Sequence, residues 1–250
     1  MKNIINNFLN ALVFLTRIPV KIKNHSILKI NYLPLVGLLM AFIIIAAEYL
    51  LMNFFTVEIR ALLLLMLYIY LSGALHLDGL GDFCDGFFAG RDQEKTAAIM
   101  HDSNSGIFAL VALILVLILK YLLFKELLFA DHIEALIIMA VIARFSLAQV
   151  IMFANVSKLS VMAEALKANA KKTDLFYCNL ITFIILGVYI YFYGLNFVYP
   201  ILLALVLILA LILFLLNWSQ KKLGGITGDI YGTIIELGEI LFLLALTIYL

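Results

Sequence analysis

Three aspartates recur at short spacing in residues 76–86, which read HLDGLGDFCDG. Asp78, Asp82 and Asp85 stand at positions i, i+4 and i+7, so a helix would present them on one narrow face. Carboxylates held this close repel one another, and a divalent cation relieves that repulsion. Mg²⁺ and Mn²⁺ suit such oxygen ligands and complete their shells with water and substrate phosphate. The pattern therefore predicts a metal centre that handles phosphates; the alternative is a helix end whose carboxylates simply face solvent.

A polar stretch follows at residues 90–106. Arg91 is suited to neutralising phosphate, and Asp102 is suited to binding metal or acting as a general base. Asp102 also precedes serines and then an apolar run, so the N-cap of a helix is an equally good interpretation of it.

A second glycine-punctuated segment, residues 224–229, reads GGITGD and follows two lysines. Glycines expose backbone N–H groups that can cradle phosphate oxygens, a threonine can donate a hydrogen bond, and Asp229 can bind metal. The expected substrate contacts in and beside this segment are Gly224, Gly225, Thr227 and Lys222.

The rest of the chain is strongly apolar. Of its 250 residues, 66% are hydrophobic and only 13% are charged, against roughly 25% charged in an average soluble domain. Apolar runs of roughly 20 residues recur, and a backbone in lipid must satisfy its own hydrogen bonds, so each run predicts a spanning helix. We expect an all-α, polytopic integral membrane protein with a single membrane-embedded domain, residues 1–250. The predicted spans, about seven in number, are 34–55, 59–77, 106–129, 133–154, 175–193, 198–217 and 233–250.

The N-terminal residues 4–18 are apolar but too short to cross comfortably, and Pro19 closes them. An interfacial or re-entrant helix is expected there, with an additional crossing as the alternative.

Lysine and arginine predict the orientation of the spans. The N-terminal arm and the loops after the second, fourth and sixth spans hold most of the 17 basic residues, whereas the opposite side holds only Arg60 and Lys125. The N-terminus and the two polar segments, 76–106 and 221–232, are therefore expected on the cytoplasmic side, where the segments can share one site. The net charge of +1 and the lack of a basic run give no reason to expect nucleic acid as a partner.

Two cations fall inside predicted spans, where an unpaired charge is costly. Lys120 is expected to extend its ammonium group to the membrane surface. Arg144 has no interface within reach and needs a buried carboxylate or a substrate phosphate as its partner. The candidate carboxylates are Glu48, Glu236 and Glu239, of which Glu236 is favoured.

Taken in order along the chain, these motifs resemble the cobalamin synthase family, the adenosylcobinamide-GDP ribazoletransferases of corrin biosynthesis. None of the matching stretches is decisive alone, but together they are specific. They are FLTRIPV at 14–20, PLVG at 34–37, the aspartate segment at 76–86, Gly90-Arg91, Ile99-Met100 with Asp102-Ser103, and GGITGD at 224–229 with Glu236.

The resemblance implies transfer of the phosphocobinamide group of adenosylcobinamide-GDP to α-ribazole or its 5′-phosphate, releasing GMP and forming adenosylcobalamin or its 5′-phosphate. It also implies a Mg²⁺-dependent enzyme in the cytoplasmic (inner) membrane of a prokaryote. Asp82 is then expected to orient or deprotonate the attacking ribose hydroxyl, with Asp78 and Asp85 as the other catalytic carboxylates. Arg91 and Arg144 are expected on phosphate. The expected metal ligands are Asp78, Asp82, Asp85, Asp102 and Asp229.

The chain departs from the family pattern at several positions. His101, Asn104 and Gln93 stand where similar proteins usually or often have lysine, arginine and arginine. Tyr231 and Thr233 stand where leucine and alanine are more frequent. The departures indicate either a divergent substrate or charge compensation by the remaining cations, which are Arg91, Arg144, Lys221 and Lys222.

Two other functions remain open from the sequence. A CDP-alcohol phosphotransferase also uses spaced aspartates on membrane helices, but its Asp-Gly followed by Ala-Arg and two later aspartates is missing here. A cation transporter would use the aspartates as an ion path and leave the glycine-rich loops unexplained. The lipid bilayer is the expected environment. The resemblance to cobalamin synthases also allows a homo-oligomer or a complex with other corrin-pathway enzymes as an expectation.

Overall fold

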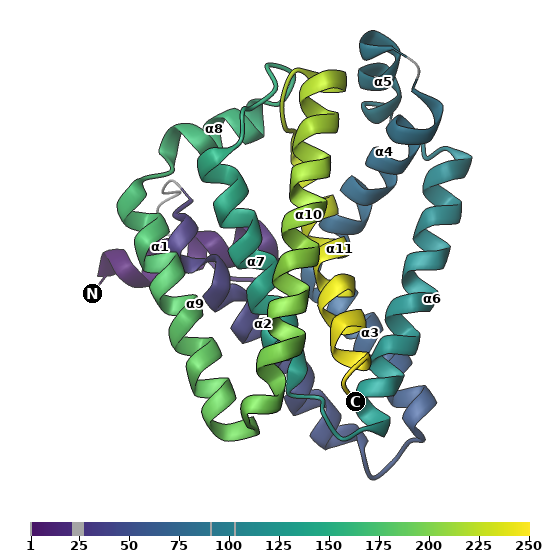
Figure 1. Cartoon of the computed structure of the whole chain (residues 1–250), viewed down its shortest axis with the longest axis vertical. Coiled ribbons are helices and arrows are strands. Elements are labelled where there is room, and N and C mark those ends of the chain that lie inside the picture. The colour runs from purple at the N-terminus through teal and green to yellow at the C-terminus, as the bar shows by residue number, and fades with distance from the viewer. Residues whose placement is uncertain (1, 22–27, 91, 103) are drawn as a thin grey trace.

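The chain folds into a bundle of α-helices (Figure 1). The computed structural model describes residues 2–21, 28–90, 92–102 and 104–250. Short 3₁₀ turns at Ile30–Tyr32 and Leu195–Phe197 lead into the second and tenth helices. The helices are α1 (Lys2–Leu15), α2 (Leu33–Leu51), α3 (Val57–Ser72), α4 (Leu75–Ala89), α5 (Gln93–Met100), α6 (Ile107–Phe129), α7 (Ala135–Phe153), α8 (Val161–Asn169), α9 (Lys172–Tyr193), α10 (Val198–Leu223) and α11 (Gly228–Thr247).

Within the described ranges, six helical segments are long and apolar enough to cross a membrane, and a seventh span results if α3 and α4 are counted as one bent span. This confirms the prediction of an all-α, polytopic membrane protein. The N-terminal helix α1 has 14 residues, too few to cross, and it lies across the bundle instead of along it (Figure 1).

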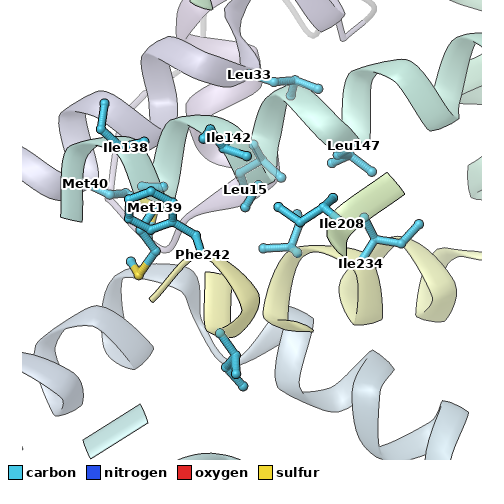
Figure 2. Packing of buried hydrophobic residues seen from close by; sticks show 14 of the residues in the cluster. Leu15, Leu33, Met40, Ile138, Met139, Ile142, Leu147, Ile208, Ile234 and Phe242 are labelled. Carbon is cyan, nitrogen blue, oxygen red and sulfur yellow. The ribbon is translucent and has the colours of Figure 1, made fainter. Parts of the chain in front are cut away.

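The two helices α7 and α11 form the centre of the bundle. Of their most apolar stretches, 72% and 78% of the residues are buried, whereas only 22% are buried in α6. A helix that is apolar on all sides packs inside, and one with a large exposed apolar face suits contact with lipid. Figure 2 shows Ile142 and Leu147 of α7 beside the α11 residues Ile234 and Phe242, with Met40 of α2 also in the cluster.

The predicted span 59–77 is broken in the structure. Helix α3 ends at Ser72, α4 begins at Leu75, and the two axes differ by 87°. Gly73 and Ala74 both adopt left-handed backbone conformations, with φ of 64° and 56°, which a continuous helix does not allow. The aspartate segment therefore lies on its own short helix, turned away from α3.

The N-terminal arm packs against this break. The backbone N–H of Arg17 donates to the carbonyl of Leu71 at 2.7 Å. A Cβ atom at Gly73 would lie 2.3 Å from Cγ of Arg17, so only glycine fits both the backbone conformation and this contact. The N-terminal arm therefore packs against the turn between α3 and α4.

The polar segments meet at one end of the bundle. Helices α4, α5 and α8 lie at that end, and the C-terminus lies at the other (Figure 1). The last helix begins at Gly228, earlier than the predicted start at 233, so Asp229 lies in its first turn and not in a loop. The shared location of residues 76–106 and 221–232 agrees with the sequence prediction.

Candidate active site

A cavity of about 440 Å³ lies at this end of the bundle, between α4, the loop before α6, the start of α8 and the start of α11. Its lining is mostly polar. The lining residues are Asp78, Asp82, Met100, His101, Asp102, Ser105, Ser160, Met162, Thr227, Gly228 and Asp229. Four of the five predicted metal ligands therefore face one space, although they come from three separate parts of the chain.

Close glycine packing brings α4 and α11 together beneath the cavity. A Cβ atom at Gly79 would lie 2.9 Å from Cα of Asp229, and one at Gly232 would lie 3.0 Å from the carbonyl oxygen of His76. Small residues at a helix contact allow two backbones to approach this closely. The hydroxyl of Thr233 donates to the carbonyl oxygen of Asp229 at 2.8 Å and also lies 3.3 Å from the carbonyl oxygen of Gly79, across the helix contact. The glycines thus place the carboxylate of Asp229 opposite those of α4.

The aspartates of α4 and α11 at the cavity differ in exposure. Asp78 is exposed, and Asp82 and Asp229 are half-buried. The charges of Asp229, Asp78 and Asp85 all bear on Asp82, with Asp229 the strongest of the three. Asp82 therefore lies half-buried beside like charges, and a cation in the cavity would relieve that repulsion.

The start of α11 also faces the cavity. Thr227 is its N-cap, and the hydroxyl of Thr227 donates to Oδ2 of Asp229 at 3.1 Å. The first N–H groups of a helix have no partner within the helix, and together with the helix dipole they favour an anion. Thr227 and Gly228 therefore offer a phosphate site next to the carboxylates.

Asp85 has a different place from the one predicted. It is 6% exposed and does not line the cavity. Its two carboxylate oxygens accept the backbone N–H groups of Gly106 at 2.6 Å and Ala109 at 2.9 Å, at the start of α6. The carboxylate caps a neighbouring helix, and this use competes with metal binding. Sequence spacing placed Asp85 on the right helix face, but it could not show that α6 begins there.

We expect the Asp85→Asn variant to lose about 1–3 kcal/mol of stability, because an amide accepts only one of the two N–H groups and loses the charge. Thermal unfolding in detergent measures the loss. The Mg²⁺ concentration needed for half-maximal activity should stay unchanged. A large increase in that concentration would show that Asp85 does bind the metal.

The glycine-rich turn also differs from the prediction for it. The N–H groups of Gly224 and Gly225 both donate to the carbonyl of Ser219, and neither glycine lines the cavity. The next residue, Ile226, pairs with residues 155–157 through an isolated parallel β-bridge at Val156. The turn therefore closes α10 and joins it to the loop before α8, so its glycines do not cradle a phosphate. Lys222, in the last turn of α10, is half-buried and does not line the cavity either.

The loop between α5 and α6 supplies the rim of the cavity. Asp102 and His101 are exposed and line it. Asn104 donates its backbone N–H and its side-chain amide to Oδ1 of Asp102, both at 2.9 Å, and these bonds lower the pKa of Asp102. Gln93 donates to the carbonyl of Lys221 at 2.7 Å, joining α5 to α10. Asn104 and Gln93, two of the departures from the family pattern, thus have hydrogen-bond partners within the protein. Arg91 lies outside the described residues.

Arg144 is not at the cavity. It is fully buried, and it pairs with Glu239 and with the hydroxyl of Tyr68 at 2.9 Å. Lys120 is 2% exposed and pairs with Glu236 and, at 2.7 Å, with Glu239.

Three predictions about these cations are therefore wrong: Glu239 and not Glu236 is the partner of Arg144, Lys120 does not extend to the surface, and Arg144 is not placed to bind phosphate. Positions 236 and 239 share one face of α11, which lies between α6 and α7, so both cations reach this one helix. The remaining candidate, Glu48, pairs with Arg60.

Sequence reasoning missed the contribution of α8. Ser160, its N-cap, and Met162 both line the cavity. Ser105, in the loop before α6, was likewise not singled out. A serine at a helix N-cap is an ordinary local signal, and no pattern in the sequence joins residue 160 to residue 78.

The donor set suits Mg²⁺, although the described side chains do not form a closed cage. Among them, no group of three His, Cys, Asp or Glu residues is close enough to hold a metal ion by itself. Mg²⁺ usually binds one or two carboxylates and keeps waters and substrate phosphates in its shell. Asp78, Asp82 and Asp229 around one polar cavity agree with that kind of site.

Fold and site together define a polytopic α-helical membrane protein with a carboxylate-lined cavity at one end of its bundle. The chain belongs to the cobalamin-5-phosphate synthase family, which it matches over residues 7–247. A protein of Clostridium botulinum (strain Kyoto) named adenosylcobinamide-GDP ribazoletransferase is 38% identical, over 98% of this chain and 99% of its own. Proteins of the same name are 32% identical in Clostridium kluyveri, over 99% and 98% of the two chains, and 34% identical in Clostridium acetobutylicum, over 94% and 92%. No solved structure matches the chain.

Proposed function

We propose that this protein transfers the phosphocobinamide group of adenosylcobinamide-GDP to α-ribazole or its 5′-phosphate, releasing GMP and forming adenosylcobalamin or its 5′-phosphate. The observation that carries the proposal is the shared cavity of Asp78, Asp82 and Asp229, beside the start of α11, in a chain of this family. The family relationship favours this reaction over phospholipid synthesis and over ion transport.

In this reaction the oxygen of a ribose hydroxyl bonds to the phosphorus that carries cobinamide. The bond from that phosphorus to the oxygen bridging the two phosphates breaks, and GMP leaves with that oxygen. The hydroxyl proton needs an acceptor, and Asp82 fits this task because its carboxylate lines the cavity and is half-buried beside Asp78 and Asp229. The start of α11 fits the binding of a phosphate through Thr227 and the first N–H groups of the helix.

Asp78 and Asp229 are the carboxylates best placed to hold Mg²⁺, with Asp102 at the rim. When bound, the metal would offset the charge of the diphosphate and of the departing GMP. The exposed imidazole of His101 also lines the cavity and is suited to donating a hydrogen bond to a phosphate oxygen.

The same proposal places the cavity on the cytoplasmic side of a prokaryotic inner membrane. The support is the distribution of lysine and arginine along the chain, where most of them stand in the N-terminal arm and in the segments around α5, α8 and the end of α10.

The test is release of GMP by the full chain, purified in detergent, with adenosylcobinamide-GDP, α-ribazole and a Mg²⁺ titration. We expect GMP release to need both substrates and to stop when EDTA removes the metal. A parallel incubation with CDP-diacylglycerol and an alcohol serves as the comparison. Release of CMP there, without release of GMP in the first assay, would refute the proposal.

A further inference from the structure

A second, smaller cavity of about 70 Å³ adjoins the aspartate cavity. We call it the base chamber. Asp78, Gly228 and Asp229 line both spaces, so a ligand at the carboxylates can extend from one into the other. The walls of the base chamber come from α1, α4, α7, α8 and α11.

The walls of the base chamber are mainly apolar. Leu15, Leu147, Leu166 and Ile235 are among the residues that line it. The chamber continues past Phe14, Met162 and Leu166 toward a groove of about 260 Å³, because each of these side chains lines both spaces. Met162 is exposed, and a methionine side chain is flexible, so Met162 can move to admit a flat ring.

Two polar atoms in these apolar walls have no partner. Nε2 of His76 and the hydroxyl of Tyr231 are buried, and neither has a hydrogen-bond partner among the described residues. Both residues line the base chamber, and each is 4% exposed. A buried polar group without a partner is costly, so two in one small space indicate a ligand that supplies the missing bonds.

We infer that the base chamber binds the aromatic base of the riboside substrate, with the hydroxyl of Tyr231 donating to its unsubstituted ring nitrogen and His76 in the same wall. The inference rests on the proposed function. A ribose at Asp78 and Asp82 would direct its base into the adjoining chamber, because the two spaces share a wall. Flat rings suit the apolar sides, and a benzimidazole keeps one unsubstituted ring nitrogen that can accept a hydrogen bond. Tyr231 is then a residue that determines which base is accepted.

The test compares Tyr231→Phe with the unmodified protein on two ribosides. One is α-ribazole, and the other is its indole analogue, in which carbon replaces the unsubstituted ring nitrogen. Removal of the hydroxyl should raise the KM for α-ribazole about fivefold to tenfold, the effect of one hydrogen bond. The KM for adenosylcobinamide-GDP and the kcat should not change, and the variant should not discriminate against the indole analogue.

Calorimetric titration of α-ribazole, without the GDP substrate, provides a second readout that does not need turnover. Tyr189→Phe removes a hydroxyl from a buried tyrosine of α9 that does not line the chamber, and it serves as the control. An unchanged KM and Kd for α-ribazole in Tyr231→Phe would overturn the inference, as would an equal loss with the indole analogue. Failure of the unmodified protein to release GMP would instead overturn the proposed function, while the calorimetric comparison would still decide on the chamber.

Discussion

Replacement of Asp82 by asparagine is expected to lower kcat for GMP release by about 10²–10⁴-fold, the usual contribution of a proton acceptor. The amide has nearly the same shape but cannot take the proton of the ribose hydroxyl. Asp82 is half-buried and faces the charges of Asp229 and Asp78, so no other described carboxylate shares its position. The measurement is single-turnover GMP release at saturating Mg²⁺ and both substrates.

The same assay separates the metal ligands from the base. Asp229→Asn should raise the Mg²⁺ concentration needed for half-maximal turnover, and excess Mg²⁺ should recover part of the rate. Asp82→Asn should not respond to added metal in this way. Asp92→Asn is the matched control, because Asp92 is an exposed aspartate that caps α5, and asparagine caps a helix equally well. Turnover of Asp82→Asn at the rate of this control would refute the assignment.

The second large effect is expected from Glu239→Gln, which should destabilise the protein by about 3–5 kcal/mol. Glu239 is fully buried and bonds to Lys120, Arg144 and the hydroxyl of Tyr68. Its two carboxylate oxygens serve two cations from different helices. Loss of this charge leaves Lys120 and Arg144 with Glu236 alone, and an unbalanced charge inside the bundle is expensive.

Unfolding in detergent, followed by the fluorescence of the single tryptophan, measures this effect. Glu58→Gln provides the control, because the pair of Glu58 with Lys125 is solvent-exposed and should contribute little. Adding Arg144→Met to Glu239→Gln removes the excess positive charge and should recover part of the stability. The double variant should also keep its kcat per folded molecule. A loss of GMP release in this variant would show that Arg144 contacts the substrate.

The carboxylates of this protein have two different roles, one at the cavity and one inside the helix bundle. The carboxylates of Asp229 on α11 and of Asp78 and Asp82 on α4 face a cavity, where a substrate and its metal can satisfy them. The carboxylates farther along α11 are already satisfied by Lys120 and Arg144. One helix therefore contributes to the chemistry at its first turn and holds the bundle together in its middle.

Much of this protein follows from its sequence alone. Apolar runs of spanning length determine the helices, because the bilayer admits few other backbones. The spacing of Asp78, Asp82 and Asp229 within glycine-rich segments was enough to predict a shared carboxylate site, since these residue types have few other uses near membrane depth. Residue types and their spacing along the chain are therefore sufficient to predict a local cluster of carboxylates.

Only the tertiary structure decided which polar groups are available to a ligand. Asp85 matches Asp82 in type and spacing, yet it caps α6 because that helix begins beside it. Arg144 could have faced a phosphate, but α11 presents Glu239 to it across the bundle. The break after Gly73 and the base chamber with Tyr231 likewise depend on contacts between distant segments. Sequence spacing fixes which residues share a helix face, whereas the packing of helices determines what that face meets.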